Sequence, residues 1–277
     1  MKLSIPTLFL FFTLICSNAL AQATLPDRLV LGFGQASDYD PADWLFVAPT
    51  PLGVTRADPD QTISATPGDP GTWNWSIQAP QEVLVAINPA FDLTDSQVET
   101  TFDFVGSGGI SIGFLNRFGT VADPSDPTNR LAHGYCTLVS PQTITLIDFD
   151  FARAPDDYVR PLAQLATPEG LFTGAETTVI FQTLDKPSAA DPNVTVPTFD
   201  FWLGGQQILA GVEDPNASWS SGFSGVDVWT VDPFAGLAAS SFNVNFDSLA
   251  IRGVPEPSGG SLCLLAGFAL IGLRRRR

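Results

Sequence analysis

Residues 199–211 read FDFWLGGQQILAG and give the clearest hairpin signal in the chain. Phe199, Phe201 and Leu203 recur at every second position, which is the period of a β-strand with one buried face. Gly204-Gly205 follows directly, and two glycines allow the positive φ angles that a tight two-residue turn requires. A second apolar stretch comes after this turn. The segment therefore predicts a β-hairpin.

The same alternation recurs along the chain. In residues 98–104 the apolar side chains alternate with Glu99 and Asp103, which indicates a strand with one buried and one wet face. Further strands are predicted at residues 110–114 and 179–183, and Phe242–Ile251 predicts a closing strand near the end of the chain.

Two segments depart from this simple pattern. In residues 143–151 the apolar side chains occupy even positions up to Leu146 and odd positions from Ile147 onward, and a β-bulge near Leu146 would account for the switch. Pro161–Ala166 is the one stretch that favours a short helix. Along the rest of the body the apolar pattern has a period of two much more often than a period of 3.6.

Turn signals separate the predicted strands. Eight Asp-Pro pairs punctuate the chain, and proline disfavours helical backbone angles in the residue before it. Many strands and little helix predict an all-β fold, an antiparallel two-sheet sandwich. The hairpin at 199–211 and the closing strand Phe242–Ile251 resemble the concanavalin A-like (laminin G type) jelly roll. That resemblance implies a scaffold common among sugar-binding and matrix proteins.

The N-terminus predicts export. Lys2 is followed by an uncharged run over residues 3–15 and then by Ala19 and Ala21, which form a small-residue A-x-A site. This order is typical of a secretory signal peptide, here residues 1–21, cleaved after Ala21. Residues 22–253 then form the β-sandwich domain.

The C-terminus carries a second signal, residues 254–277. An uncharged run over residues 259–273 is shorter than the roughly 20 residues that span a bilayer, so it suits a temporary transmembrane helix. Terminal arginines hold the end of such a helix on the cytoplasmic side. The residues that make up the rest of the signal are Val254, Pro255, Glu256, Pro257 and Ser258 before the run, and Arg274, Arg275, Arg276 and Arg277 after it.

This order resembles the PEP-CTERM sorting signal. The resemblance implies that exosortase, a transpeptidase-like membrane enzyme, recognises the tail and removes it, and that the protein is then released or attached in the extracellular matrix. We expect an exported bacterial protein of the cell surface, outer envelope or medium, held briefly in the inner membrane by its tail. An ordinary C-terminal membrane anchor is the alternative.

If processing falls just after Pro257, residues 22–257 keep 8 basic and 29 acidic side chains, a net charge of −21. Such an acidic protein repels nucleic acid and anionic lipid, so a nucleic-acid partner is excluded. Cys136 is the one cysteine left between the two predicted cleavage points, so no internal disulfide is expected. The domain must therefore depend on its hydrophobic core.

No catalytic set emerges from the sequence. The sole histidine, His133, lies three residues from Cys136, and such positions on a strand face opposite sides. Asp148 and Asp150 share one face of a predicted strand, where they could bind calcium or act as acid and base. The interpretation favoured for both is the solvated outer face of an edge strand. No metal or other cofactor is therefore predicted.

Two functions remain open. The first is a non-enzymatic surface or matrix protein that binds exopolysaccharide or another glycan. The second is a secreted glycan-active enzyme, a glycoside hydrolase or lyase, on the same scaffold. Exposed tryptophans would support sugar binding, but core packing is the favoured interpretation of Trp73, Trp75, Trp219 and Trp229.

Overall fold

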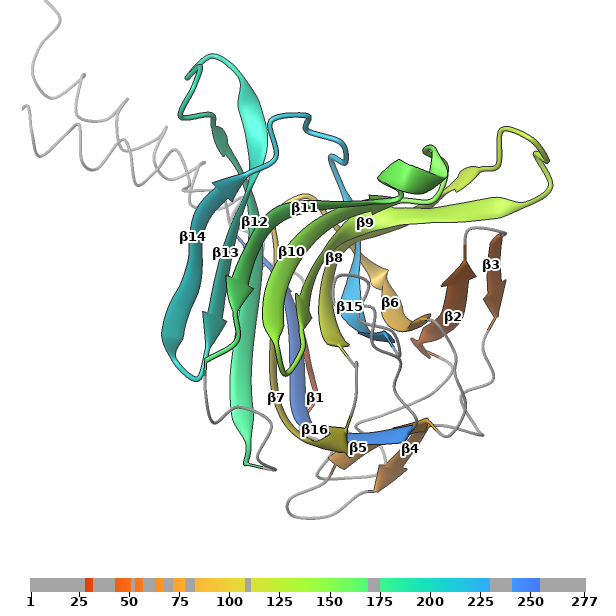
Figure 1. The fold of residues 1–277 in the computed structure, drawn as a ribbon, viewed down its shortest axis with the longest axis vertical. Coiled ribbons are helices and arrows are strands. Elements are labelled where there is room, and N and C mark those ends of the chain that lie inside the picture. Colours follow the sequence, from red (N-terminus) through yellow and green to blue (C-terminus); the bar gives the residue numbers. More distant parts are fainter. Residues whose placement is uncertain are drawn as a thin grey trace, which may run out of the picture. The chain divides into compact units, whose positions relative to one another are not determined.

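Two antiparallel β-sheets make up the described part of the protein (Figure 1). The computed structural model describes residues 28–31, 43–50, 53–56, 63–66, 72–77, 83–107, 111–168, 175–229 and 241–254. Within these residues the structure is built mainly of strands, and a short 3₁₀ helix lies at Pro155–Asp157. The predicted all-β, two-sheet sandwich is confirmed. The predicted signal peptide and the tail beyond Val254 lie outside the described residues.

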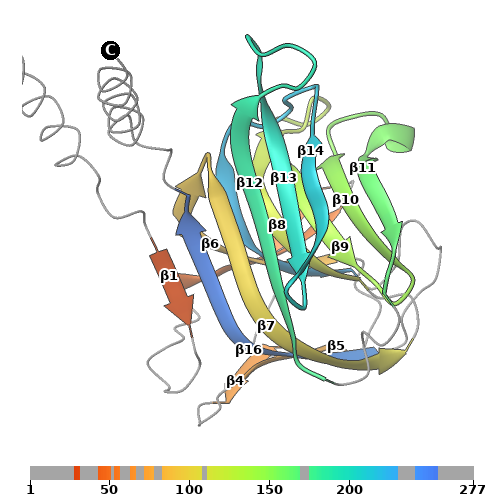
Figure 2. The ribbon, with the colours of Figure 1, turned by 90° about the vertical axis from the view of Figure 1, so that its left-hand side faces the viewer.

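The first sheet, sheet A, is centred on strands that are far apart in the sequence (Figure 2). Its last strand along the chain, β16, lies in the interior of the sheet, because β7 pairs with one edge of β16 while β5 and β1 share the other. Its order is β14 (Gln206–Glu213), β13 (Thr195–Leu203), β12 (Thr177–Pro187), β7 (Ser96–Ser107), β16 (Ser241–Gly253), β5 (Thr72–Ile77) and β4 (Ile63–Thr66), with β1 (Arg28–Leu31) beside β16.

The second sheet, sheet B, contains the other eight strands. Its order is β11 (Val159–Ala166), β10 (Thr143–Asp150), β9 (Arg130–Val139), β8 (Ser111–Ala122), β15 (Gly222–Trp229), β6 (Val83–Leu93), β2 (Leu45–Thr50) and β3 (Gly53–Arg56).

The predicted hairpin is confirmed. Strands β13 and β14 pair from Leu203 opposite Gln206, and the two residues between them have positive φ angles of 57° at Gly204 and 80° at Gly205. A residue with a β-carbon pays a steric penalty in this region, and glycine does not. The sequence therefore places the turn by backbone chemistry alone.

The main core lies between the two sheets. Phe199, Phe201 and Phe181 from sheet A meet Phe114 and Tyr135 from sheet B, and all five side chains are buried. Trp73 and Trp75 belong to the same cluster, with their ring centroids 5.0 Å apart in an edge-to-face arrangement. Core packing, the interpretation favoured for these two tryptophans, is confirmed.

A second core covers the other face of sheet B, and it corrects the bulge prediction. Ile144 and Leu146 pack in the main core, whereas Ile147 and Phe149 pack in the second core. Strand β10 thus keeps its alternation and is buried on both faces, and its pairing with β9 runs without a break. The register shift at Leu146 concerns the pairing with β11, which carries one extra residue there.

The helix predicted at Pro161–Ala166 is wrong, because these residues belong to β11. Strand β11 is the edge of sheet B, where Pro161 needs no hydrogen-bond donor on one side. Its side chains are half-buried or exposed, so the two-residue period that marks the inner strands is weak in this segment. The pairing with β10 decides the conformation.

The chain from Arg28 to Gly253 forms one compact unit. Strand β16 ends at Gly253, and the predicted closing strand is confirmed. The described residues include no helix long and apolar enough to cross a bilayer. The predicted membrane segment, residues 259–273, is not among them.

Candidate functional site

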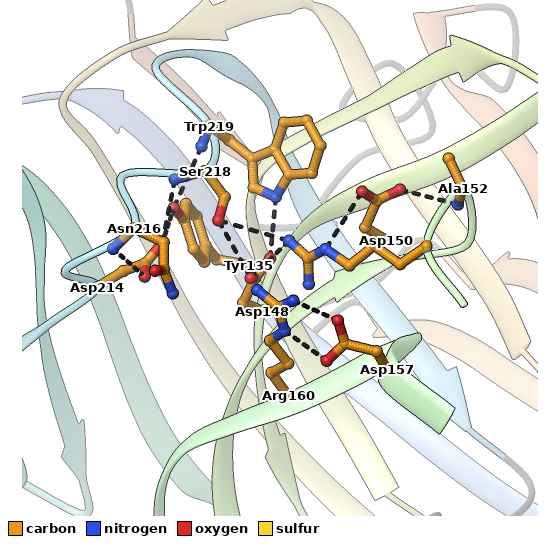
Figure 3. A network of polar contacts seen from close by, with 11 residues as sticks. Tyr135, Asp148, Asp150, Ala152, Asp157, Arg160, Asp214, Asn216, Ser218 and Trp219 are labelled. Atoms are coloured by element: carbon orange, nitrogen blue, oxygen red, sulfur yellow. Dashed lines mark hydrogen bonds and ion pairs between the residues drawn. The ribbon is translucent and has the colours of Figure 1, made fainter. Parts of the chain in front are cut away.

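A cluster of polar and charged side chains lies beside the main core, near the start of β9 and the end of β10 (Figure 3). We call it the polar corner. Two loops complete it, the loop after β10 and the loop between β14 and β15. Its members are His133, Tyr135, Asp148, Asp150, Arg153, Asp157, Arg160, Asp214, Ser218 and Trp219.

Arg153 occupies the centre of the polar corner. Its Nη2 donates to Asp148 Oδ2 at 2.6 Å, and its Nε lies 3.3 Å from Asp150 Oδ2. The backbone N of Ala152 also donates to Asp150 Oδ1 at 2.9 Å. One guanidinium thus links both strand carboxylates and fixes the start of the loop that carries it.

Asp148 also holds the second loop. Its Oδ1 accepts from Trp219 Nε1 at 3.0 Å, and its Oδ2 accepts from Ser218 Oγ at 3.2 Å. The Asp148 carboxyl is fully buried, and burial raises its pKa, although the hydrogen bonds from Arg153 and Trp219 act in the opposite direction. The carboxylate serves as the meeting point of three segments.

His133 and Trp219 form a stacked pair. Their ring centroids are 3.7 Å apart with an interplanar angle of 18°. Burial lowers the pKa of His133 to about 4, against the opposing effect of Asp150, so the imidazole is neutral at neutral pH. Gly119 makes room for the ring, because a β-carbon there would lie 2.6 Å from the His133 Cε1 atom.

Tyr135 and Asp214 complete the corner from the main-core side. Tyr135 Oη donates to Asp214 Oδ2 at 2.7 Å and accepts from the backbone N of Trp219 at 3.2 Å. Burial acts to raise the pKa of Asp214, but the hydrogen bonds from Tyr135 and from the backbone of Ser218 and Asn216 outweigh it and hold the pKa below its usual range. The loop is thereby tied to sheet B.

The interpretation of Asp148 and Asp150 as a solvated outer face is wrong. Both side chains are on one face of β10, as predicted, but Asp148 is fully buried and Asp150 is 9% exposed. Strand β10 is an inner strand, covered at its edge by β11. Their cation in this structure is the Arg153 guanidinium, and the described residues contain no cluster of acids, histidines or cysteines suited to a metal ion.

His133 and Cys136 lie on opposite faces of β9, as predicted. His133 belongs to the polar corner, whereas Cys136 is in the second core. There the Cys136 Sγ lies 3.5 Å from Asp227 Oδ1, and Trp229 Nε1 donates to Asp227 Oδ2 at 2.7 Å. Burial raises the pKa of Asp227 to about 7. Sequence reasoning named neither Asp227 nor Arg153.

The predicted export and sorting residues fall almost entirely outside the described residues. Val254 is the exception, a half-buried residue directly after β16. Outside the description are Ala19 and Ala21 at the signal cleavage site, and Pro255, Glu256, Pro257, Ser258, Arg274, Arg275, Arg276 and Arg277 in the tail.

No family model matches the chain, and no curated protein matches it. Among solved structures, a native glycosidic hydrolase matches with a TM-score of 0.52 and 14% identity over 84% of this chain and 100% of that chain. A Crh5 transglycosylase in complex with NAG matches with a TM-score of 0.50 and 10% identity over 87% of this chain and 92% of that chain. The Emp47p carbohydrate recognition domain matches with a TM-score of 0.47 and 14% identity over 82% of this chain and 96% of that chain. Identities this low show a shared fold and no more.

Proposed function

We propose that this chain is an exported bacterial surface or matrix protein that exosortase processes at its tail, and that its jelly-roll domain is a non-enzymatic module that binds exopolysaccharide or another glycan. The proposal rests on the order of three segments near the end of the sequence. The motif Val254 to Ser258 comes first, an uncharged run follows it, and Arg274 to Arg277 come last. In a transient membrane stop, the motif presents the cleavage site, the uncharged run arrests export of the chain, and the arginines fix the orientation of the helix in the membrane.

The end of β16 supports this assignment. The last strand is complete at Gly253, and the motif begins at the next residue. Cleavage beyond Val254 therefore removes no strand from sheet A. From Gly253 to Pro257 the chain spans at most about 14 Å when fully extended, so the processing enzyme must work close to the folded domain.

The polar corner supports a non-enzymatic role. Asp148, Asp150 and Asp214 each have an internal partner that fixes a loop, and the His133 ring is stacked on Trp219. Catalytic acids and bases must instead reach a substrate. The glycosidic hydrolase and the NAG-bound transglycosylase of similar fold support a glycan as the ligand class.

One observation favours the alternative, a glycoside hydrolase or lyase. The Asp227 carboxyl has a pKa raised to about 7 by burial, in the range that suits a general acid. Its side chain is only 1% exposed and lies in the second core. A substrate would need that core to open, so we favour the binding module.

Fractionation of a producing culture tests the sorting proposal. In a host with exosortase we expect the wild-type chain to lose its tail, whereas the double variant Pro255→Ala/Glu256→Ala should accumulate uncut in the membrane fraction. Leu165→Ala, an exposed change on β11, is the matched control and should be processed like the wild type. Equal loss of the tail in a host without exosortase would refute the proposal.

Glycan arrays with parallel measurement of reducing-sugar release test the activity of the domain. Binding without release supports the module. Release of reducing ends that Asp227→Asn abolishes would establish the alternative instead.

A further inference from the structure

Strands β13, β12 and β7 lie side by side in sheet A (Figure 2). Alternate residues of these strands belong to the main core, so the residues between them point to the outer face of the sheet. Phe201 and Leu203 are in that core, so Trp202 between them points outward. Trp202 lies opposite Ile180 on β12, and Ile180 lies opposite Glu99 on β7. On its other side Trp202 is paired with Gln207 of β14.

Trp202 differs from the other tryptophans of the chain. The structure describes all six, and four of them are at most 6% exposed: Trp44, Trp73, Trp75 and Trp229. Trp219 is half-buried, but His133 stacks on its ring. Trp202 is also half-buried, and no hydrogen bond or ring contact to its indole occurs among the described residues. It is therefore the tryptophan with ring surface left for a ligand.

Glutamine side chains lie on the same face in the neighbouring strands: Gln207 of β14 is paired with Trp202, and Gln182 of β12 is paired with Gln97 of β7. Gln182 Nε2 donates to Gln97 Oε1 at a long 3.4 Å, and Gln207 Nε2 donates to Asp200 Oδ1 at 3.1 Å. Gln207 is exposed, and Gln97 and Gln182 are half-buried. Each amide has further donor and acceptor capacity, which hydroxyl groups of a ligand can use.

Two ion pairs lie on this face near Trp202, and Asp103 lies farther along β7 on the same face, near the acids Asp247 and Glu176. Lys186 Nζ lies 3.3 Å from Asp200 Oδ2, and Arg252 pairs with Glu99. The face around Trp202 therefore presents amides and an indole with little net charge. The chain as a whole has a net charge of −16, which repels polyanions.

We infer that the outer face of sheet A around Trp202 binds a neutral polysaccharide. The flat indole packs against the apolar face of a sugar ring, and the amides of Gln182, Gln97 and Gln207 bond to its hydroxyls. This inference rests on the glycan-binding part of the proposed function and gives it a location and a ligand class.

Affinity electrophoresis tests the inference. The secreted protein, purified with its ends as the cell leaves them, runs through gels that contain hydroxyethyl cellulose, dextran, galactomannan or alginate. We expect retardation in at least one neutral gel, and Trp202→Ala should weaken it about tenfold, equivalent to about 1.4 kcal/mol. Trp202→Phe should keep part of the binding, and Leu165→Ala, an exposed apolar residue of sheet B, should keep all of it.

The outcomes separate the two proposals. Retardation that Trp202→Ala leaves unchanged overturns the location while glycan binding stands. Retardation in alginate alone overturns the neutral ligand class. No retardation in any gel overturns both the inference and the glycan-binding part of the proposed function. A dimer in analytical ultracentrifugation that Trp202→Ala dissociates would assign this face to a second copy of the chain. Thermal unfolding of each variant verifies that it is folded.

Discussion

Replacement of Asp227 by asparagine should change how stability depends on pH. The carboxyl is buried in the second core, and burial raises its pKa from the ordinary aspartate value of 3.8 to about 7 in the folded protein. A group whose folded pKa is raised contributes stability that is complete below the unfolded pKa and is lost as pH rises through the folded pKa. Wild-type stability should therefore fall between about pH 4 and pH 7 through this group.

The size of the effect follows from the two pKa values. A difference of about three units corresponds to about 4 kcal/mol at pH 7. Asparagine fits in the same place, because its amide oxygen can accept the hydrogen bond that Trp229 Nε1 donates to the carboxyl at 2.7 Å. Asp227→Asn carries no proton equilibrium, so near pH 4 it should match the wild type and near pH 7 it should be more stable by up to that amount.

Urea unfolding of the purified protein from pH 4 to pH 8, followed by tryptophan fluorescence, measures this difference. His133 acts in the opposite sense. Burial lowers its pKa to about 4, so the protein becomes less stable as pH falls from about 6.5 towards 4. The effect of Asp227 is therefore measured as the difference between wild type and Asp227→Asn. Asp156→Asn, a change at an exposed residue of the 3₁₀ helix Pro155–Asp157, is the control and should follow the wild type. Parallel pH profiles of wild type and Asp227→Asn would refute the reasoning.

Three further predictions concern the polar corner and the hairpin. Arg153→Met leaves two buried carboxylates without their cation, and the free energy of unfolding measured in urea should fall by about 3 to 5 kcal/mol. Arg160→Met removes an exposed ion pair and should lower the same free energy by less than about 1 kcal/mol. Equal losses of stability would contradict the central role of Arg153. Gly204→Ala, where φ is 57° and space is open, should cost about 1 to 2 kcal/mol from backbone strain alone; no loss would mean that the turn adjusts. Gly119→Ala must displace the His133 ring and should lower the free energy of unfolding by about 1 to 3 kcal/mol. Because His133 stacks on Trp219, the displacement should also alter tryptophan emission. Unchanged emission would argue against that displacement.

The parts of the fold that the sequence predicts are those set by local chemistry. Gly204-Gly205 and the alternation before it place the hairpin, because turn angles and strand period are properties of neighbouring residues. Strand β10 is harder to predict from sequence. It is buried on both faces, and its apolar pattern is therefore the same as that of a strand in which a bulge moves the buried face from one side to the other. The sequence predicts a helix for the β11 segment because this edge strand lacks the two-residue period of the inner strands.

The polar corner could not be predicted, because its partners are distant in sequence. Asp148 meets Trp219 across 71 positions, and nothing near either residue signals the other. Trp202 is different. Its place between Phe201 and Leu203, both expected to face inward, already implies an outward indole. That signal was present in the hairpin pattern itself.

The position of β16 makes the fold sensitive to completeness of the chain. Sheet A has its final strand in its interior, joined to β7 on one side and to β5 and β1 on the other. A polypeptide that ends before Ser241 leaves β7 and β5 without their common neighbour, and open strand edges invite aggregation and proteolysis. We therefore expect a chain that stops before β16 to misfold, so that only chains synthesised through Gly253, the residue before the predicted tail, reach the folded state.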